Sequence, residues 1–267
     1  MIRRHSKAAR KAARRRRWQE LRDRRGQGIF LLPSLLTTGN LFCGFFAMIL
    51  TVQGRYPEAV LAIYVAMVMD LLDGRVARLM KATSQFGVEF DSLADVVSFC
   101  VAPGFLVYSF ALSQLGRPAW FGAFLFVICG ALRLARFNVQ TGTVDKRFFV
   151  GLSTPAAAGA VASTVMLLDK FELDRWQLTL IAVGTYGVAL LMVSTFKYWS
   201  FKEVTFARRH PAQALLVVVL GIMIVATHPE LFLFLIFMGY ALSGPVRRLI
   251  VGAPVVATTE PAAPERS

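Results

Sequence analysis

The chain has 267 residues, of which 56% are hydrophobic and only 17% are charged, and its formal net charge is +14. A soluble domain usually carries about 25% charged residues, so this composition argues against an ordinary soluble enzyme. It also argues against a disordered chain, because phenylalanine alone occurs 22 times. The composition is typical of a membrane protein with a strongly basic segment.

The basic segment is the N-terminus. Residues 1–27 contain 12 of the 30 lysines and arginines and only two acidic residues, so they carry a charge of +10. We expect residues 1–28 to form a basic cytoplasmic arm that lies on anionic membrane lipid. An arginine-rich transit peptide is the alternative, since the arm is poor in acids. Nucleic acid is not an expected partner, because nothing after the arm resembles a recognition module.

Apolar runs long enough to cross a bilayer follow the arm. A membrane helix needs about 20 apolar residues, and the sequence predicts an all-α, polytopic membrane helical bundle over residues 29–251. The eight candidate spans, of which the fifth and seventh are short, are 33–53, 57–80, 92–114, 119–138, 153–169, 177–196, 211–227 and 230–250. Residues 252–267 are rich in proline, alanine and threonine, which is typical of a disordered tail.

The charges of the loops test the number of spans and their orientation. With eight spans, 26 lysines and arginines fall on the side of the arm and four on the other side. Cytoplasmic loops carry the excess of positive charge, so we expect both termini in the cytoplasm, in a protein of the bacterial inner membrane. Six spans would also keep the termini together. The three cysteines lie in apolar runs and predict no disulfide framework.

Four aspartates interrupt the second and third spans. Asp70 and Asp73 are three residues apart, and Asp91 and Asp95 are four apart, so each pair lies on one face of its helix. An aspartate at the centre of a membrane helix costs about 2.5–3.5 kcal/mol, so the group needs compensation. With a connection of about ten residues, the two helices pair antiparallel, and the sequence predicts that all four carboxylates surround one small volume.

Divalent cations would compensate these charges. Oxygen ligands favour Mg²⁺, Mn²⁺ or Ca²⁺ over zinc, and two such ions held by shared carboxylates form a site for phosphoryl chemistry. Gly74 would allow a ligand to approach its helix, and the guanidinium of Arg78 suits a phosphate. The alternative is a buried ion network in which the acids pair with Arg75, Arg78 and Lys81, but three cations do not neutralise Glu89 and four aspartates.

The spacing of these residues resembles the signature of the CDP-alcohol phosphatidyltransferase family, D-x2-D-G-x2-A-R-x8-G-x3-D-x3-D. All eight fixed positions match, at Asp70, Asp73, Gly74, Ala77, Arg78, Gly87, Asp91 and Asp95. The resemblance implies a six-helix core, here followed by about two C-terminal helices, and usually a homodimer. It implies two bound divalent cations, Mg²⁺ or Mn²⁺. Their ligands would be Asp70, Asp73, Asp91 and Asp95, with Asp95 also the general base.

The resemblance extends beyond the signature. It implies that Gly74, Ala77 and Arg78 bind the CDP moiety. The stretches LPSLLTTGNLFCGFFA, FDSLADVVSFCVAP, LRLARFNVQ and FVGLSTPAAAG resemble family members that transfer the phosphatidyl group of CDP-diacylglycerol to L-serine, giving phosphatidylserine and CMP. The likeness covers about residues 31–170. Ser34 and Cys100 depart from the common pattern, outside the signature.

The acceptor site is less specified. Serine carries a carboxylate, so we expect a cation near it, and Arg133 and Arg136 lie three residues apart at the cytoplasmic end of the fourth span, followed by Asn138. Ordinary positive flanking of a membrane helix is the alternative reading of these arginines. Thr37 and Asn40 on the first span either face the nucleotide or make a polar contact between helices.

Two rival functions stay open. The same chemistry with another acceptor, glycerol 3-phosphate or an inositol phosphate, would leave the signature unchanged, because the signature binds the shared CDP part. An ion-coupled transporter also carries acids within the membrane. A transporter, however, would spread its acids over several spans, whereas here they cluster in one helix pair.

Overall fold

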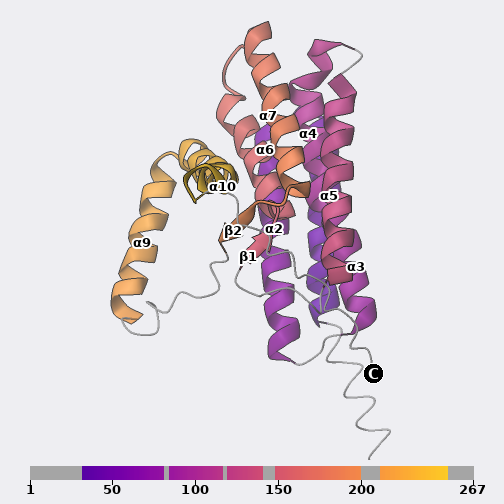
Figure 1. The fold of residues 1–267 in the computed structure, drawn as a ribbon, viewed down its shortest axis with the longest axis vertical. Helices are drawn as coiled ribbons and strands as arrows, with labels where there is room; N and C mark the ends of the chain where they lie inside the picture. Colours follow the sequence, from indigo (N-terminus) through magenta and orange to yellow (C-terminus); the bar gives the residue numbers. More distant parts are fainter. Residues whose placement is uncertain (1–31, 81–83, 117–118, 141–147, 200–210, 252–267) are drawn as a thin grey trace, which may run out of the picture.

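The computed structural model describes residues 32–80, 84–116, 119–140, 148–199 and 211–251. The predicted basic arm, the predicted C-terminal tail and Lys81 lie outside these residues. The described part is a bundle of long helices with one short β-ribbon beside it (Figure 1). This arrangement confirms the predicted all-α, polytopic fold class.

Within the described residues, six helices form the core of the bundle, and two more follow it. The first is the helix Leu32–Val52. The third is continuous from Gln85 to Phe110 and includes a π-helical segment, η1. The elements after the first helix are, in chain order, α2 (Tyr56–Leu79), α3 (Gln85–Asp95), η1 (Val96–Val101), α4 (Ala102–Phe110), the 3-10 turn η2 (Leu112–Leu115), α5 (Trp120–Gln140), β1 (Phe148–Val150), α6 (Thr154–Leu168), α7 (Arg175–Val193), β2 (Lys197–Trp199), α9 (Pro211–Thr227) and α10 (Pro229–Val251).

Each of the eight predicted spans corresponds to a helix, but the helices are not equally suited to a bilayer. Five are long and apolar enough to cross a membrane: Leu32–Val52, Gln85–Phe110, Trp120–Val139, Arg175–Val193 and Pro229–Ile250. The helices α6 and α9 are apolar but shorter, as predicted for the fifth and seventh spans. The helix α2 is 24 residues long, and its acidic and basic residues set it apart from the apolar five.

The third helix begins earlier than the hydropathy predicted. The expected span started at residue 92, whereas α3 starts at Gln85 and brings Asp91 into the helix. The Ser84 hydroxyl accepts a hydrogen bond from the Gly87 amide at 3.0 Å and caps this end. Only five residues therefore separate α2 from α3, rather than about ten. Hydropathy placed the start too late because Glu89 and Asp91 interrupt the apolar run at this end.

The first helix crosses η1 at very close range. A Cβ atom on Gly44 would collide with the side chain and backbone of Ser98, so only glycine fits there. The Ser98 hydroxyl donates a hydrogen bond to the backbone carbonyl of Asn40 at 2.9 Å. On the other side of η1, a Cβ atom on Gly130 of α5 would collide with the Cys100 side chain. The π-helical segment η1 thus packs closely against the first helix on one side and against α5 on the other.

Small residues make α6 the centre of the bundle. Ala157, Ala158, Ala160 and Ala162 have no exposed surface, and α6 packs against α2, α4 and α10. A Cβ atom on Gly159 would overlap the ring of Phe237 from α10. The small-residue face of α6 therefore serves close helix packing within one chain.

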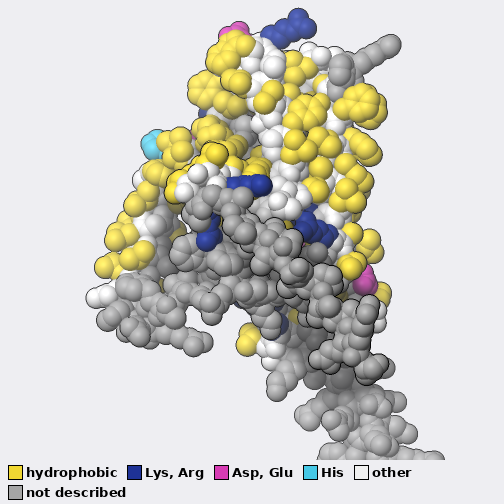
Figure 2. Space-filling model, viewed as in Figure 1, with side chains coloured by type: hydrophobic (Ala, Val, Ile, Leu, Met, Phe, Trp, Pro, Cys, Tyr) yellow, Lys and Arg dark blue, Asp and Glu magenta, His cyan; other side chains and the backbone are white. Residues whose placement is uncertain are grey.

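A short β-ribbon contacts α10 in the C-terminal part of the structure. The three-residue strands β1 and β2 pair antiparallel, and were too short to be visible as a periodic pattern. The Tyr198 hydroxyl donates to the Ala241 carbonyl at 2.9 Å and ties the ribbon to α10. In Figure 1, α9 lies away from the bundle. Figure 2 shows hydrophobic side chains spread over the visible face of the bundle, as expected for a surface in contact with lipid.

Candidate active site

The predicted aspartates do come together. Carboxylate oxygens of Asp70, Asp91 and Asp95 all lie within 4.8 Å of one another. Asp70 comes from the C-terminal half of α2, and the other two come from α3. The reversal of the chain between α2 and α3 thus brings carboxylates up to 25 residues apart in the sequence to one place, and the three that converge are Asp70, Asp91 and Asp95.

The fourth aspartate is held by the first helix. The Thr37 hydroxyl lies 2.9 Å from Asp73 Oδ2, and it is also 3.1 Å from the Pro33 carbonyl. Asp73 and Thr37 are only 4% and 5% exposed. Asp73 faces the same pocket as Asp91. The first helix therefore supplies a hydrogen-bond donor that orients this carboxylate.

The first helix makes a matching contact with Asp95. The amide Nδ2 of Asn40 donates to Asp95 Oδ1 at 3.2 Å, and Asn40 has no exposed surface. The Oδ1 atom of Asn40 is buried without a hydrogen-bond partner. Because Thr37 and Asn40 are three residues apart, they share one face of the helix, and that face contacts both aspartate pairs.

A pocket of about 210 Å³ opens beside the carboxylates. We call it the acidic pocket. Its lining includes six of the eight signature residues, namely Asp73, Gly74, Ala77, Arg78, Gly87 and Asp91. The first helix adds Pro33, Ser34 and Thr37, and Ser84 and Val88 complete the lining. The residues predicted to bind a nucleotide therefore line one space with two of the predicted metal ligands, Asp73 and Asp91, whereas Asp70 and Asp95 do not line it.

The chemistry of this cluster fits divalent cations. Among the described residues, the two ion pairs are Arg55–Glu58 and Lys170–Glu230, and neither involves the four aspartates. The Oδ1 atom of Asp91 is buried without a hydrogen-bond partner. Converging, half-buried carboxylates that form no ion pair within 4.0 Å with a described residue are the oxygen ligands that Mg²⁺ and Mn²⁺ favour. The alternative of an ion network with Arg75 and Arg78 is not seen in this part of the chain.

The residues expected at the acceptor site differ in depth. Arg133 on α5 is largely buried, its Nη1 lies 3.4 Å from Thr154 Oγ1, and its buried Nε has no partner. Its charge lies close enough to Asp95 for electrostatic interaction. Arg136 is exposed, whereas the Asn138 amide donates to the Ser92 hydroxyl at 2.9 Å and joins the end of α5 to α3.

Several residues of the site have no motif that would have revealed them. Ser92 and Ser98 lie between or after the signature aspartates, and their partners are 46 and 58 residues away in the sequence. Ser84 did have a local signal, because serine is among the residues preferred at the N-cap of a helix. Ser34, which departs from the common family pattern, lines the acidic pocket.

Comparison with known proteins agrees with this geometry. A model of the family described as CDP-alcohol phosphatidyltransferase matches residues 30–193, which run from the first helix to the end of α7. The helices α9 and α10 lie outside the match.

Several relatives bear the name CDP-diacylglycerol–serine O-phosphatidyltransferase. A protein of Helicobacter pylori (strain ATCC 700392 / 26695) is 36% identical over 232 residues, which cover 85% of this chain and 95% of that protein. One from Bacillus subtilis (strain 168) is 36% identical over 172 residues, or 64% of this chain and 92% of the relative. One from Methanocaldococcus jannaschii is 35% identical over 170 residues, or 64% and 74%.

Proposed function

The chain belongs to the CDP-alcohol phosphatidyltransferase family, and from this premise we propose that it transfers the phosphatidyl group of CDP-diacylglycerol to the hydroxyl of L-serine. The products are phosphatidylserine and CMP. The observation that carries the proposal is the acidic pocket, where signature residues from α2 and α3 surround one space next to converging carboxylates. The names of the relatives support serine as the acceptor.

Each aspartate has a proposed role in holding metal. Asp70, Asp73 and Asp91 would hold two divalent cations, Mg²⁺ or Mn²⁺, and Asp95 would share the second. When bound, such ions neutralise the charge of the phosphates and of the leaving group. The hydroxyl of Thr37 donates a hydrogen bond to Oδ2 of Asp73 and orients the carboxylate. The other oxygen of Asp73 would then be available as a metal ligand.

The nucleotide would occupy the acidic pocket. Gly74 and Ala77 offer a lining without bulk, so the backbone of α2 is accessible to the CDP moiety. Arg78 lines the same space, and its planar guanidinium suits a phosphate through two parallel hydrogen bonds. The acyl chains would stay in the bilayer beside the bundle, because the exposed surface of the first helix includes Phe42 and Phe45.

Asp95 is the proposed general base. It takes the proton from the serine hydroxyl, whose oxygen forms a bond to the phosphorus that carries diacylglycerol. The bond from that phosphorus to the oxygen of CMP breaks, and CMP leaves with the electron pair. Asn40 holds Oδ1 of Asp95 from the first helix, so the other oxygen of the carboxyl group is directed to the substrate.

The serine carboxylate requires a cation near Asp95. Arg133 is the best placed of the candidates, because it is buried, interacts electrostatically with Asp95 and has an unpartnered Nε. A buried guanidinium without a full set of acceptors is costly, so an anionic ligand would stabilise it. Arg136 and Asn138 would flank this site at the end of α5.

The placement in the cell belongs to the same proposal. The five apolar helices fit an integral membrane protein. The excess of basic residues on one side favours cytoplasmic termini and a cytoplasmic active site, in a bacterial inner membrane. The basic arm would lie on anionic lipid, and the family resemblance favours a homodimer.

An assay with single acceptors tests the proposed function. Purified chain in lipid nanodiscs receives CDP-diacylglycerol, Mg²⁺ or Mn²⁺, and one alcohol at a time, and CMP release and the lipid product are measured. Serine should support release at least about 100-fold faster than glycerol 3-phosphate or an inositol phosphate, because a site built for one carboxylate and hydroxyl rejects other groups strongly. Asp91→Asn is the inactive control. Faster turnover with either other alcohol would replace serine as the acceptor, and CMP release with none would refute the reaction class.

A further inference from the structure

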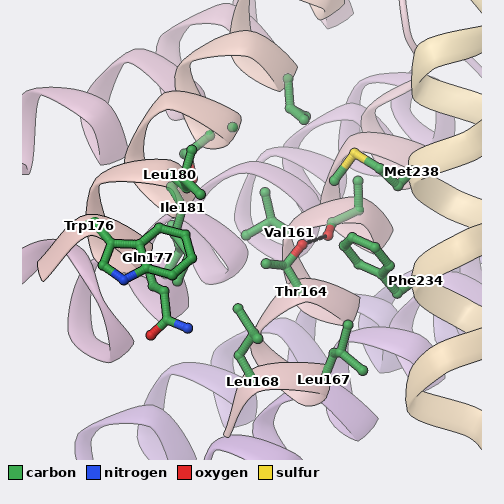
Figure 3. Close-up of a pocket in the computed structure, with 15 residues that line it drawn as sticks. Val161, Thr164, Leu167, Leu168, Trp176, Gln177, Leu180, Ile181, Phe234 and Met238 are labelled. Atoms are coloured by element: carbon green, nitrogen blue, oxygen red, sulfur yellow. Dashed lines mark hydrogen bonds between the residues drawn. The ribbon is translucent and has the colours of Figure 1, made fainter. Parts of the chain in front are cut away.

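A second hollow lies between α6, α7 and α10, and Figure 3 shows the side chains that line it. Its volume is about 300 Å³. Its floor is buried, since Ala160, Val161 and Val188 are at most 5% exposed, whereas Trp176 and Leu180 at its rim are about 60% exposed. We call this hollow the apolar groove. It is open at the rim and closed at the floor, so it is a place for a ligand and not a packing defect.

The lining is mostly apolar, and its polar groups are two threonine hydroxyls and the Gln177 amide next to Trp176. The Thr164 hydroxyl donates to the Ala160 carbonyl at 2.7 Å, which is the dashed line in Figure 3. The Thr185 hydroxyl donates to the Ile181 carbonyl at 2.8 Å in the same way. Both threonines satisfy their hydroxyls within their own helices, and Gln177 Oε1 accepts a hydrogen bond from the Asp174 backbone N–H at 2.8 Å. The remaining lining residues are almost entirely apolar. A ligand of this groove is therefore apolar along its length.

The shape of the groove selects the kind of apolar ligand. Trp176 and Val188 are twelve residues apart on α7, so the groove runs about 18 Å along the helix axis. Its volume then gives a mean cross-section of roughly 17 Å². A helix is about 10 Å wide with its side chains and does not fit. One extended hydrocarbon chain does fit.

The length and position of the groove match one leaflet of a bilayer. The hydrocarbon core is about 30 Å thick, so one leaflet contributes about 15 Å. One end of the groove carries Trp176, an aromatic residue typical of the membrane interface, and the ion pair between Lys170 and Glu230 at 2.9 Å joins α6 to α10 near this end. The groove thus extends from the headgroup level towards the centre of the membrane.

This leaflet is not the one that borders the acidic pocket. Glu58, at the start of α2, lies close enough to Asp169 at the end of α6 for electrostatic interaction. Asp73 lies fifteen residues further along α2, which is about 22 Å away. The mouth of the groove and the aspartate cluster are therefore at opposite ends of the bundle.

We propose that the apolar groove binds one acyl chain of a membrane phospholipid, in the leaflet opposite to the acidic pocket. The groove separates side chains of α10 from those of α6 and α7. The bound acyl chain would fill this space and complete the packing between the three helices. This site is independent of the proposed reaction. Its occupant is neither substrate nor product, because the reacting lipid enters at the other end.

Two glycines of α7 provide a matched test. A Cβ atom on Gly184 or on Gly187 meets no other atom within 4 Å, so a larger side chain fits at either position. Gly184 lines the groove and Gly187 does not. We would purify the full chain and its Gly184→Leu and Gly187→Leu variants in detergent from the same membranes. Native mass spectrometry then measures the phospholipid that each protein retains.

The proposal predicts one retained phospholipid per chain in the unmodified protein and in Gly187→Leu. Occupancy should fall at least about tenfold in Gly184→Leu, because the loss of two buried methylene contacts is sufficient for that change. Equal retention in both variants, or no retained phospholipid in the unmodified protein, would overturn the proposal. Loss of a dimer in place of a lipid in Gly184→Leu would assign the groove to a second copy instead.

A second pair of variants guards against misfolding of Gly184→Leu. Leu180→Trp narrows the groove from its rim, whereas Val183→Trp changes an equally exposed position of α7 that does not line it. Leu180→Trp should lose the phospholipid and Val183→Trp should keep it. Circular dichroism and the thermal midpoint of all four variants identify any that fail to fold. The same retention in Leu180→Trp and Val183→Trp would also overturn the proposal.

Discussion

The two hollows of the bundle are similar in size and opposite in chemistry. The acidic pocket of about 210 Å³ is lined by charged residues, glycines and hydroxyl groups, and the buried Oδ1 atom of Asp91 in its lining has no hydrogen-bond partner. The apolar groove of about 300 Å³ is lined mainly by hydrocarbon, with Gln177 at one end, and its hydroxyls are already bonded to their own helices. In this protein the acidic pocket thus offers ligand atoms to a polar group, whereas the apolar groove offers mainly hydrocarbon contact.

Removal of divalent cations should give the largest difference between the acidic pocket and the apolar groove. Chelation with excess EDTA should lower CMP release at least about 1000-fold, because metal ions contribute several kcal/mol of charge stabilisation at transferring phosphates. Added Mg²⁺ or Mn²⁺ should restore it. The phospholipid retained by the apolar groove should not change, as native mass spectrometry of the same samples can measure. Full activity in EDTA would remove the metal roles of the aspartates.

Replacement of the proposed base should have the next largest effect. Asp95→Asn should lower kcat by about 100- to 10,000-fold, the usual contribution of general base catalysis, and should leave binding of a CDP-lipid measurable by calorimetry. Glu89→Gln is the control, because Glu89 lies on the same helix but is exposed and outside the acidic pocket. Normal turnover in Asp95→Asn would show that another group accepts the proton.

Replacement of the two arginines of α5 should have unequal effects on the KM for serine, because Arg133 is less exposed than Arg136. Arg133→Ala should raise the KM for serine about 10- to 100-fold, because a hydrogen bond to a charged group contributes about 1.5–3 kcal/mol. Arg136→Ala should change it less than about threefold, because an exposed ion pair contributes little. Steady-state kinetics with each substrate varied separately decides between the roles. A rise in the KM for CDP-diacylglycerol as large as that for serine would refute the serine clamp.

The contacts from the first helix should give the smallest effects. Asn40→Ala should lower kcat by about 3- to 10-fold, because a single neutral hydrogen bond contributes about 0.5–1.5 kcal/mol. The pH dependence of kcat should shift as well, since the removed amide contacts the proposed base. Thr38→Val is the control, because its exposed hydroxyl bonds only to the Ser34 carbonyl. If Thr38→Val caused the same change, the effect of Asn40 would be structural.

The positions of the four aspartates were predictable from the sequence because their spacing is a local property. Residues three or four apart share a helix face, so Asp70 with Asp73 and Asp91 with Asp95 needed only the assumption that both segments are helical. Their convergence then followed from the short connection between the two helices. The helices of the described residues were predictable in the same way, from apolar runs of known length.

The contacts between distant segments were not predictable. Thr37 was visible as a polar residue on an apolar helix, but its partner Asp73 lies 36 residues away, and the sequence alone does not specify which faces meet. The π-helical segment that follows Asp95 has no compositional signal. The apolar groove was invisible for a physical reason: its lining residues have the hydropathy of residues that face lipid.

The contact between Gly159 and Phe237 links the family core to the helices that follow it. Phe237 stacks on Tyr64 of α2 at 6.0 Å between ring centroids, and it occupies the space that any side chain at position 159 would need. A larger residue at position 159 would therefore displace α10 and open one wall of the apolar groove. Across evolution, these two positions should change together: a glycine is required where α10 is present, and a lineage that lost α10 would be free to fill the gap with a larger side chain.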